Sequence, residues 1–292
     1  MSKIAFVLLY YKSLDDTIEC LESLKCLSEK KHSIEIVLVD NCSGDGSFDI
    51  LKAKYMHRKN ITFIVNSVNA GYAAGNNIGI RYAKEQLHAD FVVVLNTDTV
   101  IRQENFCDEL VDIYNQEKFY VMGPNVLGYD NGLPQSPLLL HDETNVKKLH
   151  RNNRLHWFLW KTYLIIPIRK IRKPKTIDRK PPRSNEVYTC VCHGSCLIFS
   201  PLFLEKWNGF YSETFLYREE SILFYILHTL NCKTVFTDRL TIFHKGGKSA
   251  EAEYGKQERK QRINFYRFSN QSIEKELCVR QMSPDQLSML LK

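Results

Sequence analysis

Carboxylate side chains follow two apolar runs of strand length in the first hundred residues. Asp40 ends the run 34–40, and Asp98 comes three residues after the run 91–95. A carboxylate just past a buried strand suits a hard divalent cation, which prefers oxygen ligands that it can share with phosphates. Asp98 could equally cap a helix, whereas for Asp40 we favour hydrogen bonds to a nucleoside base or a ribose hydroxyl.

Two adjacent carboxylates and a histidine form a second group of candidates in the last third of the chain. Glu219 and Glu220 could supply a general base that reaches an acceptor hydroxyl, or they could complement a helix dipole at the surface. His244 could ligate a metal, and the lysines after it could meet phosphate. The glycines of the run 69–79 would let the backbone approach a ligand or the sheet closely.

The cysteines suggest a metal site only weakly. Cys190, Cys192 and Cys196 surround His193 in the pattern C-x-C-H-x-x-C. Structural zinc sites usually draw on separated ligand pairs, so we expect small thiols buried in a strand instead. The nine cysteines are scattered and odd in number, which favours reduced thiols in the cytosol.

The pattern of apolar residues predicts the elements that would carry these side chains to one place. Strands are expected over 3–10, 34–40, 61–66 and 91–95, and helices over 15–27, 48–57, 72–87 and after Thr99. Strands that alternate with helices predict an α/β fold with a mostly parallel sheet. In such sheets ligands bind beyond the carboxyl ends of the strands, where Asp40 and Asp98 stand.

The alternation stops after Pro124, which sets the predicted division of the chain. We predict one half over 1–123, a second half over 124–249 and a helical tail over 250–292. Within the second half the sequence predicts a loop over 124–145, a basic segment over 146–183, strands over 187–200, 234–236 and 242–249, and a helix over 219–231.

The formal charge of +7 is unevenly distributed. Residues 146–183 contain 13 lysines and arginines and one acid, so this segment carries +12 and the remainder −5. Because these charges are mixed with long aliphatic side chains in one segment, the charge argues against a nucleic-acid-binding role. No run approaches the roughly 20 apolar residues that span a bilayer, and the first residues do not form a secretory signal. We therefore expect a cytoplasmic protein.

Six segments occur in the order found in a known family. They are 39–47 (VDNCSGDGS), 69–80 (NAGYAAGNNIGI), 95–99 (LNTDT), 193–200 (HGSCLIFS), 209–223 (GFYSETFLYREESIL) and 244–249 (HKGGKS). Together they resemble the family 2 inverting glycosyltransferases of the GT-A fold. The resemblance extends to the bacterial enzymes that build capsule, O-antigen and other cell-wall polysaccharides, including rhamnosyltransferases.

On the donor side, the resemblance implies a role for five residues. Asp40 would contact a uracil or thymine base, and Asn76 and Asn77 would lie near the nucleotide. Asn96 and Asp98 stand at the family's acidic metal-binding motif, with Asp98 supplying the carboxylate for Mg²⁺ or Mn²⁺. The half 1–123 would then bind the nucleotide sugar.

On the acceptor side, the resemblance places Glu219 and Glu220 where the family usually has Glu-Asp, the second position being the usual base. Gly194 and Tyr217 would line the acceptor pocket, and His244 would assist the metal or the diphosphate. The implied reaction is inverting transfer of a hexose or deoxyhexose from a UDP- or dTDP-sugar to a glycan or lipid-linked glycan.

Three departures from the family pattern leave alternatives open. Lys12 replaces a usual Asn, Glu220 is one methylene longer than the usual Asp, and Ile222 replaces a frequent Asp. These changes leave the base open between Glu219 and Glu220 and allow an inactive sugar-nucleotide-binding assembly subunit. A sugar-phosphate nucleotidyltransferase is the other alternative, but it would carry a glycine-rich loop after the first strand, and residues 10–14 contain no glycine.

Residues 155–173 combine aromatic, aliphatic and basic side chains. Trp157, Phe158 and Trp160 precede a run of isoleucines, lysines and arginines, and Pro167 interrupts any helix there. Basic residues beside interfacial aromatics suit a segment that lies on an anionic membrane surface. We expect this segment to dock the protein peripherally on the inner face of the plasma membrane. The alternative is an apolar flap over the acceptor cleft.

Overall fold

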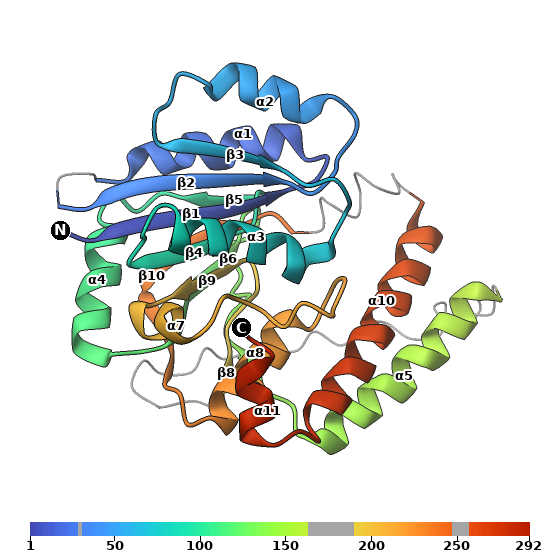
Figure 1. Cartoon of the computed structure of the whole chain (residues 1–292). Helices are drawn as coiled ribbons and strands as arrows, with labels where there is room; N and C mark the ends of the chain where they lie inside the picture. The colour runs from blue at the N-terminus through green and yellow to red at the C-terminus, as the bar shows by residue number, and fades with distance from the viewer. Residues whose placement is uncertain (29–30, 163–189, 247–256) are drawn as a thin grey trace.

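Figure 1 shows the computed structural model of the chain, which describes residues 1–28, 31–162, 190–246 and 257–292. Its first third alternates strands and helices, as the apolar pattern predicts. The elements are β1 (Lys3–Tyr10), α1 (Leu14–Ser23), the short 3-10 helix η1 (Leu24–Cys26), β2 (Ser33–Asp40), α2 (Ser47–Tyr55), β3 (Ile61–Val65), α3 (Gly71–Glu85) and β4 (Phe91–Leu95).

The remaining elements follow a less regular order. They are β5 (Thr99–Ile101), α4 (Phe106–Glu117), β6 (Val121–Gly128), β7 (Leu138–Leu139), α5 (Glu143–Lys161), β8 (Cys190–Val191), β9 (Cys196–Phe199), α7 (Pro201–Lys206), α8 (Glu219–Thr229), β10 (Thr234–His244), α10 (Glu258–Val279) and α11 (Pro284–Met289). None of the helices in the described ranges has the length and apolarity needed to cross a bilayer.

Eight strands form the central sheet, in the order β3-β2-β1-β4-β9-β6-β10-β5. The pairs β3-β2, β2-β1, β1-β4 and β6-β10 are parallel. Strand β9 runs antiparallel to both of its neighbours, and β5 runs antiparallel to β10. The predicted parallel sheet is therefore confirmed for the first four strands, while the second half of the sheet is mixed.

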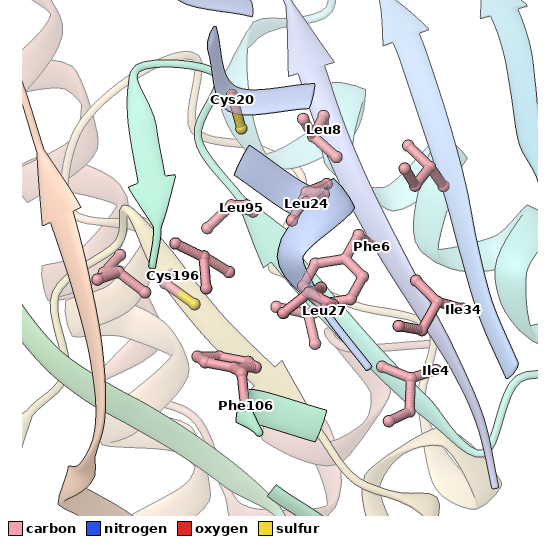
Figure 2. Packing of buried hydrophobic residues seen from close by; sticks show 14 of the residues in the cluster. Ile4, Phe6, Leu8, Cys20, Leu24, Leu27, Ile34, Leu95, Phe106 and Cys196 are labelled. Carbon is pink, nitrogen blue, oxygen red and sulfur yellow. The ribbon is translucent and has the colours of Figure 1, made fainter. Parts of the chain in front are cut away.

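Two apolar cores lie on the two faces of the sheet, because side chains alternate along each strand. Ile4, Phe6 and Leu8 of β1 enter the core that α1, α2 and α4 cover. Figure 2 shows their packing with Cys20 and Phe106. The alternate residues of β1 enter the second core, which α3, α7, α8 and α11 cover. Buried on both faces, the sheet is a rigid base for the loops at its edge.

Four predictions about elements need correction. The helix expected directly after Thr99 is strand β5, whose β-branched residues favour a strand, and helix α4 begins only at Phe106. The loop expected over 124–145 is strand β6 as far as Gly128, and α5 already begins at Glu143. Pro124 fits within β6 because the partner strand bulges between Thr237 and Thr241 at that level.

The last two corrections concern later strands. The strands expected over 234–236 and 242–249 form one bulged strand, β10, which ends at His244. In the strand expected over 187–200, β8 and β9 are separated by a turn, and residues 187–189 lie outside the described part. The predicted boundary between 123 and 124 falls within β6. The division into halves therefore stays a prediction.

Helices α5 and α10 pack side by side, away from the sheet (Figure 1). Asn153 of α5 donates a hydrogen bond to Ser269 of α10 over 2.9 Å, and His156 stacks on Tyr266 at a ring-centroid distance of 5.5 Å. The main chain of Trp160 accepts from the side chain of α10 residue Arg259. These contacts run in opposite directions along the two helices, so the pair is antiparallel.

Candidate active site

The register of two strands brings Asp98 and His244 together. Thr99 of β5 lies opposite His244 of β10, and Asp98 immediately precedes Thr99. The next residue of the β10 chain, Lys245, donates its main-chain N–H to the Asp98 carbonyl over 3.0 Å. As a result, Asp98 Oδ1 lies 3.4 Å from His244 Nε2, and both side chains keep about 11% of their surface exposed. The helix-cap role for Asp98 is wrong, because a strand follows it.

The His244 ring is held on two further sides. Its Nδ1 lies 2.7 Å from Oε1 of Gln135, in the turn after β6. The ring of His193 lies against it, with 5.1 Å between centroids. His193 is itself oriented by Ser195, whose main-chain N–H donates to His193 Nδ1 over 3.1 Å. The sequence singles out His193 only as a zinc candidate and does not single out Gln135.

Glu219 and Glu220 begin α8 and follow an unusual stretch of backbone. Tyr217 and Arg218 both have φ of 73°, which non-glycine residues adopt at a cost. A methyl group added to Gly194 would lie 3.3 Å from Glu220 Oε2, so this glycine leaves room for the carboxylate. Gly194 directly follows His193, so the segment that carries one ring of the histidine pair also lies in front of Glu220.

The two carboxyls differ in their surroundings. Glu219 is almost fully buried, whereas Glu220 is partly exposed. Burial, together with the adjacent Glu220 carboxylate, raises the pKa of Glu219 to about 8. Burial also raises the pKa of Glu220, and the Arg218 guanidinium opposes part of that rise. At neutral pH Glu219 is therefore largely protonated, and Glu220 is better suited to accept a proton.

A buried ion network fixes the backbone that precedes these carboxyls. Glu276 of α10 is fully buried and accepts from Arg218 through both Nε (2.8 Å) and Nη2 (2.6 Å). Its other oxygen accepts from Arg280. Ser272, one turn earlier in α10, donates to the carbonyl of Leu216 over 2.9 Å. Helix α10 thus anchors the start of α8.

Tyr72 is a partly buried residue that lies in the motif 69–80 and has no role predicted from the sequence. Its hydroxyl donates to the Gly194 carbonyl over 2.6 Å. Burial, followed by the charges of Glu219 and Glu220, raises its pKa well above the ordinary value. Its main-chain N–H donates to the carbonyl of Phe215 over 2.8 Å. Tyr72 therefore joins α3 to the two loops that carry the acceptor-side residues. Its position in the run 69–80 is the only signal that could have indicated it.

Asp40 lies in a separate hollow at the same edge of the sheet. The hollow has a volume of about 150 Å³ and is lined by the β2–α2 loop, α2 and Val65 of β3. Asp40 is buried and accepts a hydrogen bond from the main-chain N–H of Ser43 over 3.1 Å. Asp98, Glu220 and His244 do not line this hollow. The structure thus places Asp40 apart from the cluster around Asp98.

The loop after β1 connects the two regions. The main-chain N–H of Lys12 donates to Ser43 Oγ over 3.2 Å, on the Asp40 side. The hydroxyl of Ser13 lies 3.0 Å from that of Thr97, next to Asp98. The carboxyl ends of β1, β2 and β4 are therefore tied together.

The three candidate asparagines have different surroundings. Asn77 uses both ends of its amide on the main chain of Phe210, each over 2.8 Å, which ties α3 to the loop before α8. Asn76 donates to the carbonyl of Tyr72, while its buried Oδ1 has no hydrogen-bond partner among the described residues. Asn96 lies in the turn after β4, where its N–H donates to the Ser195 carbonyl.

Of the cysteines near His193, the side chains of Cys192 and Cys196, which the structure describes, do not converge on one point. The side chain of Cys196 lies in the core beneath α1 and α4, whereas that of Cys192 lies in the core on the opposite face of the sheet. Burial strongly raises the pKa of the Cys196 thiol, which disfavours the thiolate that zinc requires. The preference for buried thiols over a zinc site agrees with this arrangement.

The residues present fit part of a divalent-metal site. A carboxylate oxygen and an imidazole nitrogen converge at Asp98 and His244. Across the ranges that the structure describes, no group of three or more His, Cys, Asp or Glu side chains could hold a metal. A two-ligand site suits Mg²⁺ or Mn²⁺ where substrate phosphates and water complete the coordination shell.

Residues 6–180 match the family model described as Glycosyl transferase family 2. The low-salt glycan biosynthesis hexosyltransferase Agl10 of Haloferax volcanii is 24% identical over 222 residues, covering 75% of this chain and 60% of that protein. The poly(ribitol-phosphate) beta-glucosyltransferase of Bacillus spizizenii is 34% identical over 110 residues, covering 37% of this chain and 17% of that protein. The chain thus spans less than two thirds of the length of both relatives.

Solved structures share the fold at low sequence identity. Residues 1–349 of Staphylococcus aureus TarS, in complex with UDP, align with a TM-score of 0.54 and 16% identity, covering 99% of this chain and 69% of that one. GalNAc-T7 with UDP, GalNAc and Mn²⁺ aligns with a TM-score of 0.56 and 14% identity, covering 84% and 44%. The predicted GT-A fold class is confirmed.

Proposed function

The chain belongs to glycosyltransferase family 2, and on that premise we propose that it transfers a hexose or deoxyhexose from a UDP- or dTDP-sugar to a glycan or lipid-linked glycan, with inversion, in the synthesis of a bacterial surface polysaccharide. The names of the relatives support a role in glycan or cell-wall polymer synthesis. The observation that carries the proposal is that Asp98, His244 and His193 lie against one another, and that Gly194, the residue after His193, faces the Glu220 carboxylate.

Glu220 is the proposed general base. Its carboxylate accepts the proton of an acceptor hydroxyl as the hydroxyl oxygen attacks the anomeric carbon in line with the leaving group. The new glycosidic bond forms on the face opposite the diphosphate, the bond from carbon to the diphosphate oxygen breaks, and the nucleoside diphosphate leaves with the electron pair. Glu219 is largely protonated at neutral pH because its pKa is about 8, so it is not the proposed base.

Asp98 and His244 are the proposed ligands for Mg²⁺ or Mn²⁺, which when bound would stabilise the charge on the diphosphate. Asp40, in its hollow beside Ser43, is the proposed contact for the uracil or thymine base. Asn76 and Asn96 are proposed neighbours of the nucleotide. For Asn77 we propose a structural role, because the Phe210 main chain occupies its amide.

Gly194 and Tyr217 are the proposed lining of the acceptor pocket. Gly194 leaves space directly in front of Glu220. The Tyr217 ring lies against Phe265 of α10, with 4.9 Å between centroids, and stays partly exposed beside the carboxyls. Aromatic and small residues around a carboxylate would leave a sugar hydroxyl within reach of the base.

Substitution of Glu220 tests the assignment of the base. We expect Glu220→Gln to lower kcat by roughly 10²–10⁴-fold, because general-base catalysis contributes about that much. Binding of UDP, measured by calorimetry, should stay unchanged. Glu219→Gln is the matched control and should lose far less activity. The assignment is wrong if Glu220→Gln keeps wild-type turnover while Glu219→Gln abolishes it.

The product released separates the proposal from its alternatives. A transferase releases UDP or dTDP, whereas a sugar-phosphate nucleotidyltransferase releases pyrophosphate. A sugar-nucleotide-binding assembly subunit would bind the nucleotide without hydrolysing the donor or transferring the sugar. Chromatographic analysis of the nucleotides formed from a panel of UDP- and dTDP-sugars, with an acceptor glycan and added pyrophosphate, distinguishes the three. A transferase forms UDP or dTDP, a nucleotidyltransferase run in reverse forms UTP or dTTP, and a binding subunit forms no new nucleotide.

We also propose that the protein works on the inner face of the plasma membrane, docked through α5 and α10. Of the segment 155–173, the structure describes residues 155–162. Leu155 and Phe158 lie on one face of α5 and are 55% and 53% exposed. The described distal halves of the two helices, 150–161 and 258–268, contain seven lysines and arginines and one acid. Exposed apolar side chains among cations suit a surface of anionic lipid.

Flotation with lipid vesicles tests this docking. We expect the protein to bind vesicles that contain phosphatidylglycerol and not vesicles of phosphatidylcholine alone. The double substitution Leu155→Glu and Phe158→Glu should abolish binding. Ile50→Glu with Met56→Glu, two residues of similar exposure at α2, should leave binding intact. Equal binding by both double variants, or none by the wild type, would contradict the proposal.

A further inference from the structure

Gln135 lies at the end of a turn that returns the chain along β6. The N–H of Gly128, the last residue of β6, donates to the carbonyl of Leu133 over 2.8 Å. The N–H of Gln135 donates to the carbonyl of Val126 over the same distance. The hydroxyl of Ser136 then bridges the carbonyl of Pro124 and the N–H of Val126. The backbone of Gln135 is therefore fixed against the strand.

The side chain of Gln135 determines which nitrogen of His244 carries a hydrogen. Its Oε1 lies 2.7 Å from His244 Nδ1. An amide oxygen can only accept, so Nδ1 donates and the neutral ring keeps its lone pair on Nε2. That Nε2 lies 3.4 Å from Asp98 Oδ1. Two acceptors that point at each other repel unless a metal cation or a proton lies between them.

The ring is also restricted from rotating away. His193 packs against it from another side, and the main chain of His244 is paired with Thr99. The Gln135 amide nitrogen lies beside Gly128, where an added methyl group would lie 3.3 Å from it. The contacts of Gln135 thus match those of residues that orient metal-bound histidines in other proteins.

We infer that Gln135 is a positioning residue that holds His244 with Nε2 directed at the cation shared with Asp98. The inference rests on the proposed function, because it assumes a divalent cation between these two side chains. It extends that function to a residue that lies within the family match over 6–180 but outside the six segments that carry the family resemblance. Gln135 touches neither the cation nor the sugar nucleotide and acts only through the His244 ring.

Manganese affinity of the protein–UDP complex, measured from the electron paramagnetic resonance signal of free Mn²⁺, tests the inference. We expect Gln135→Leu to weaken Mn²⁺ binding by roughly 10–100-fold, the usual effect of losing such a partner. Gln135→Glu keeps an acceptor for Nδ1 and should bind within a few-fold of the wild type. Asn131→Ala breaks a hydrogen bond within the same turn, to the Leu133 N–H, and should leave the affinity unchanged.

The outcomes separate this inference from the proposed function. If the wild type binds Mn²⁺ with UDP and Gln135→Leu binds it equally well, the inference is overturned and the proposed function stands. If the wild type binds no Mn²⁺, the metal part of the proposed function fails together with the inference. Nitrogen-15 NMR of His244 in the metal-free protein gives a second readout. A hydrogen on Nδ1 supports the inference, and a hydrogen on Nε2 alone overturns it.

Discussion

At the scale of single residues, the two glutamates at the start of α8 divide their roles by environment. Glu219 is buried, and its Oε1 has no hydrogen bond of ordinary geometry among the described residues. A buried carboxyl with few partners favours its neutral form. Glu220 faces the space in front of Gly194 and is partly exposed. Two carboxyls adjacent in sequence therefore have unequal capacity to accept a proton at neutral pH.

The raised pKa of Glu219 predicts a pH dependence of stability. Its folded-state pKa is about 8, above the ordinary glutamate value. Between about pH 4.5 and pH 8 the folded state therefore keeps a proton that the unfolded state has lost, and the free energy of unfolding falls as pH rises. Relative to Glu219→Gln, the wild type should lose stability across this window and change no further above it. Urea unfolding of both proteins measures the difference, and a constant difference would contradict the assignment.

Sequence reasoning found the carboxylates but not all of their neighbours. Asp98 and Glu220 lie in motifs with a family resemblance, so they were named. His193 was considered only for zinc, and Gln135 lies in a segment expected to be a plain loop. Their importance depends on contacts across the sheet, between residues far apart in sequence. No local pattern of residues encodes such contacts.

At the scale of elements, the start of α3 and the loop before α8 meet at a glycine. Gly71 has φ of 79°, and a methyl group there would lie 2.4 Å from the carbonyl oxygen of Phe215. Tyr72 donates to that same carbonyl. The glycines of the run 69–79 were expected to let the backbone approach a ligand or the sheet closely. Gly71 lets it approach this loop, and Gly75 and Gly79 let α3 approach the sheet, where added methyl groups would lie 2.7 Å from Leu9 and 2.4 Å from Val7. The loop continues to Tyr217 and the two glutamates.

Substitution of Gly71 tests this contact between elements. Gly132 has a similar φ of 63° with nothing within 4 Å, so Gly132→Ala carries only the backbone cost of about 1–2 kcal/mol. Gly71→Ala adds the contact with Phe215, and we expect a further loss of about 1–3 kcal/mol. Urea denaturation measures both. If both substitutions lowered the free energy of unfolding equally, the contact with Phe215 would carry no cost, and the loop before α8 would move aside freely.

At the scale of the whole molecule, the sheet explains both the success and the limit of sequence prediction. The elements from β1 to β4 were predicted because each apolar run is continuous and each helix is local. The second half was harder, because β6 contains Gly123, Pro124 and Asn125, residues typical of turns. That stretch is a strand because β10 pairs with it from elsewhere in the chain.

The sheet also explains why the candidate site has two parts. Asp40 ends β2, and Asp98 follows β4, with β1 between those strands. A nucleotide-sugar donor also has two ends, with the nucleoside at one and the diphosphate and sugar at the other. In the proposed function the nucleoside lies at Asp40 and the diphosphate at Asp98. The loop after β1, with Lys12 and Ser13, bridges the two parts through Ser43 and Thr97. If the proposed function is right, one donor molecule occupies both parts.

The most direct test of that requirement is the melting temperature of the protein with UDP, with and without Mn²⁺, because ligands that bind only the folded state raise it. We expect UDP and Mn²⁺ together to raise the melting temperature of the wild type by more than either alone. Asp98→Ala should lose this additional rise, and Asp112→Ala, which removes an exposed carboxylate from α4, should keep it. A full metal-dependent rise in Asp98→Ala would contradict the account.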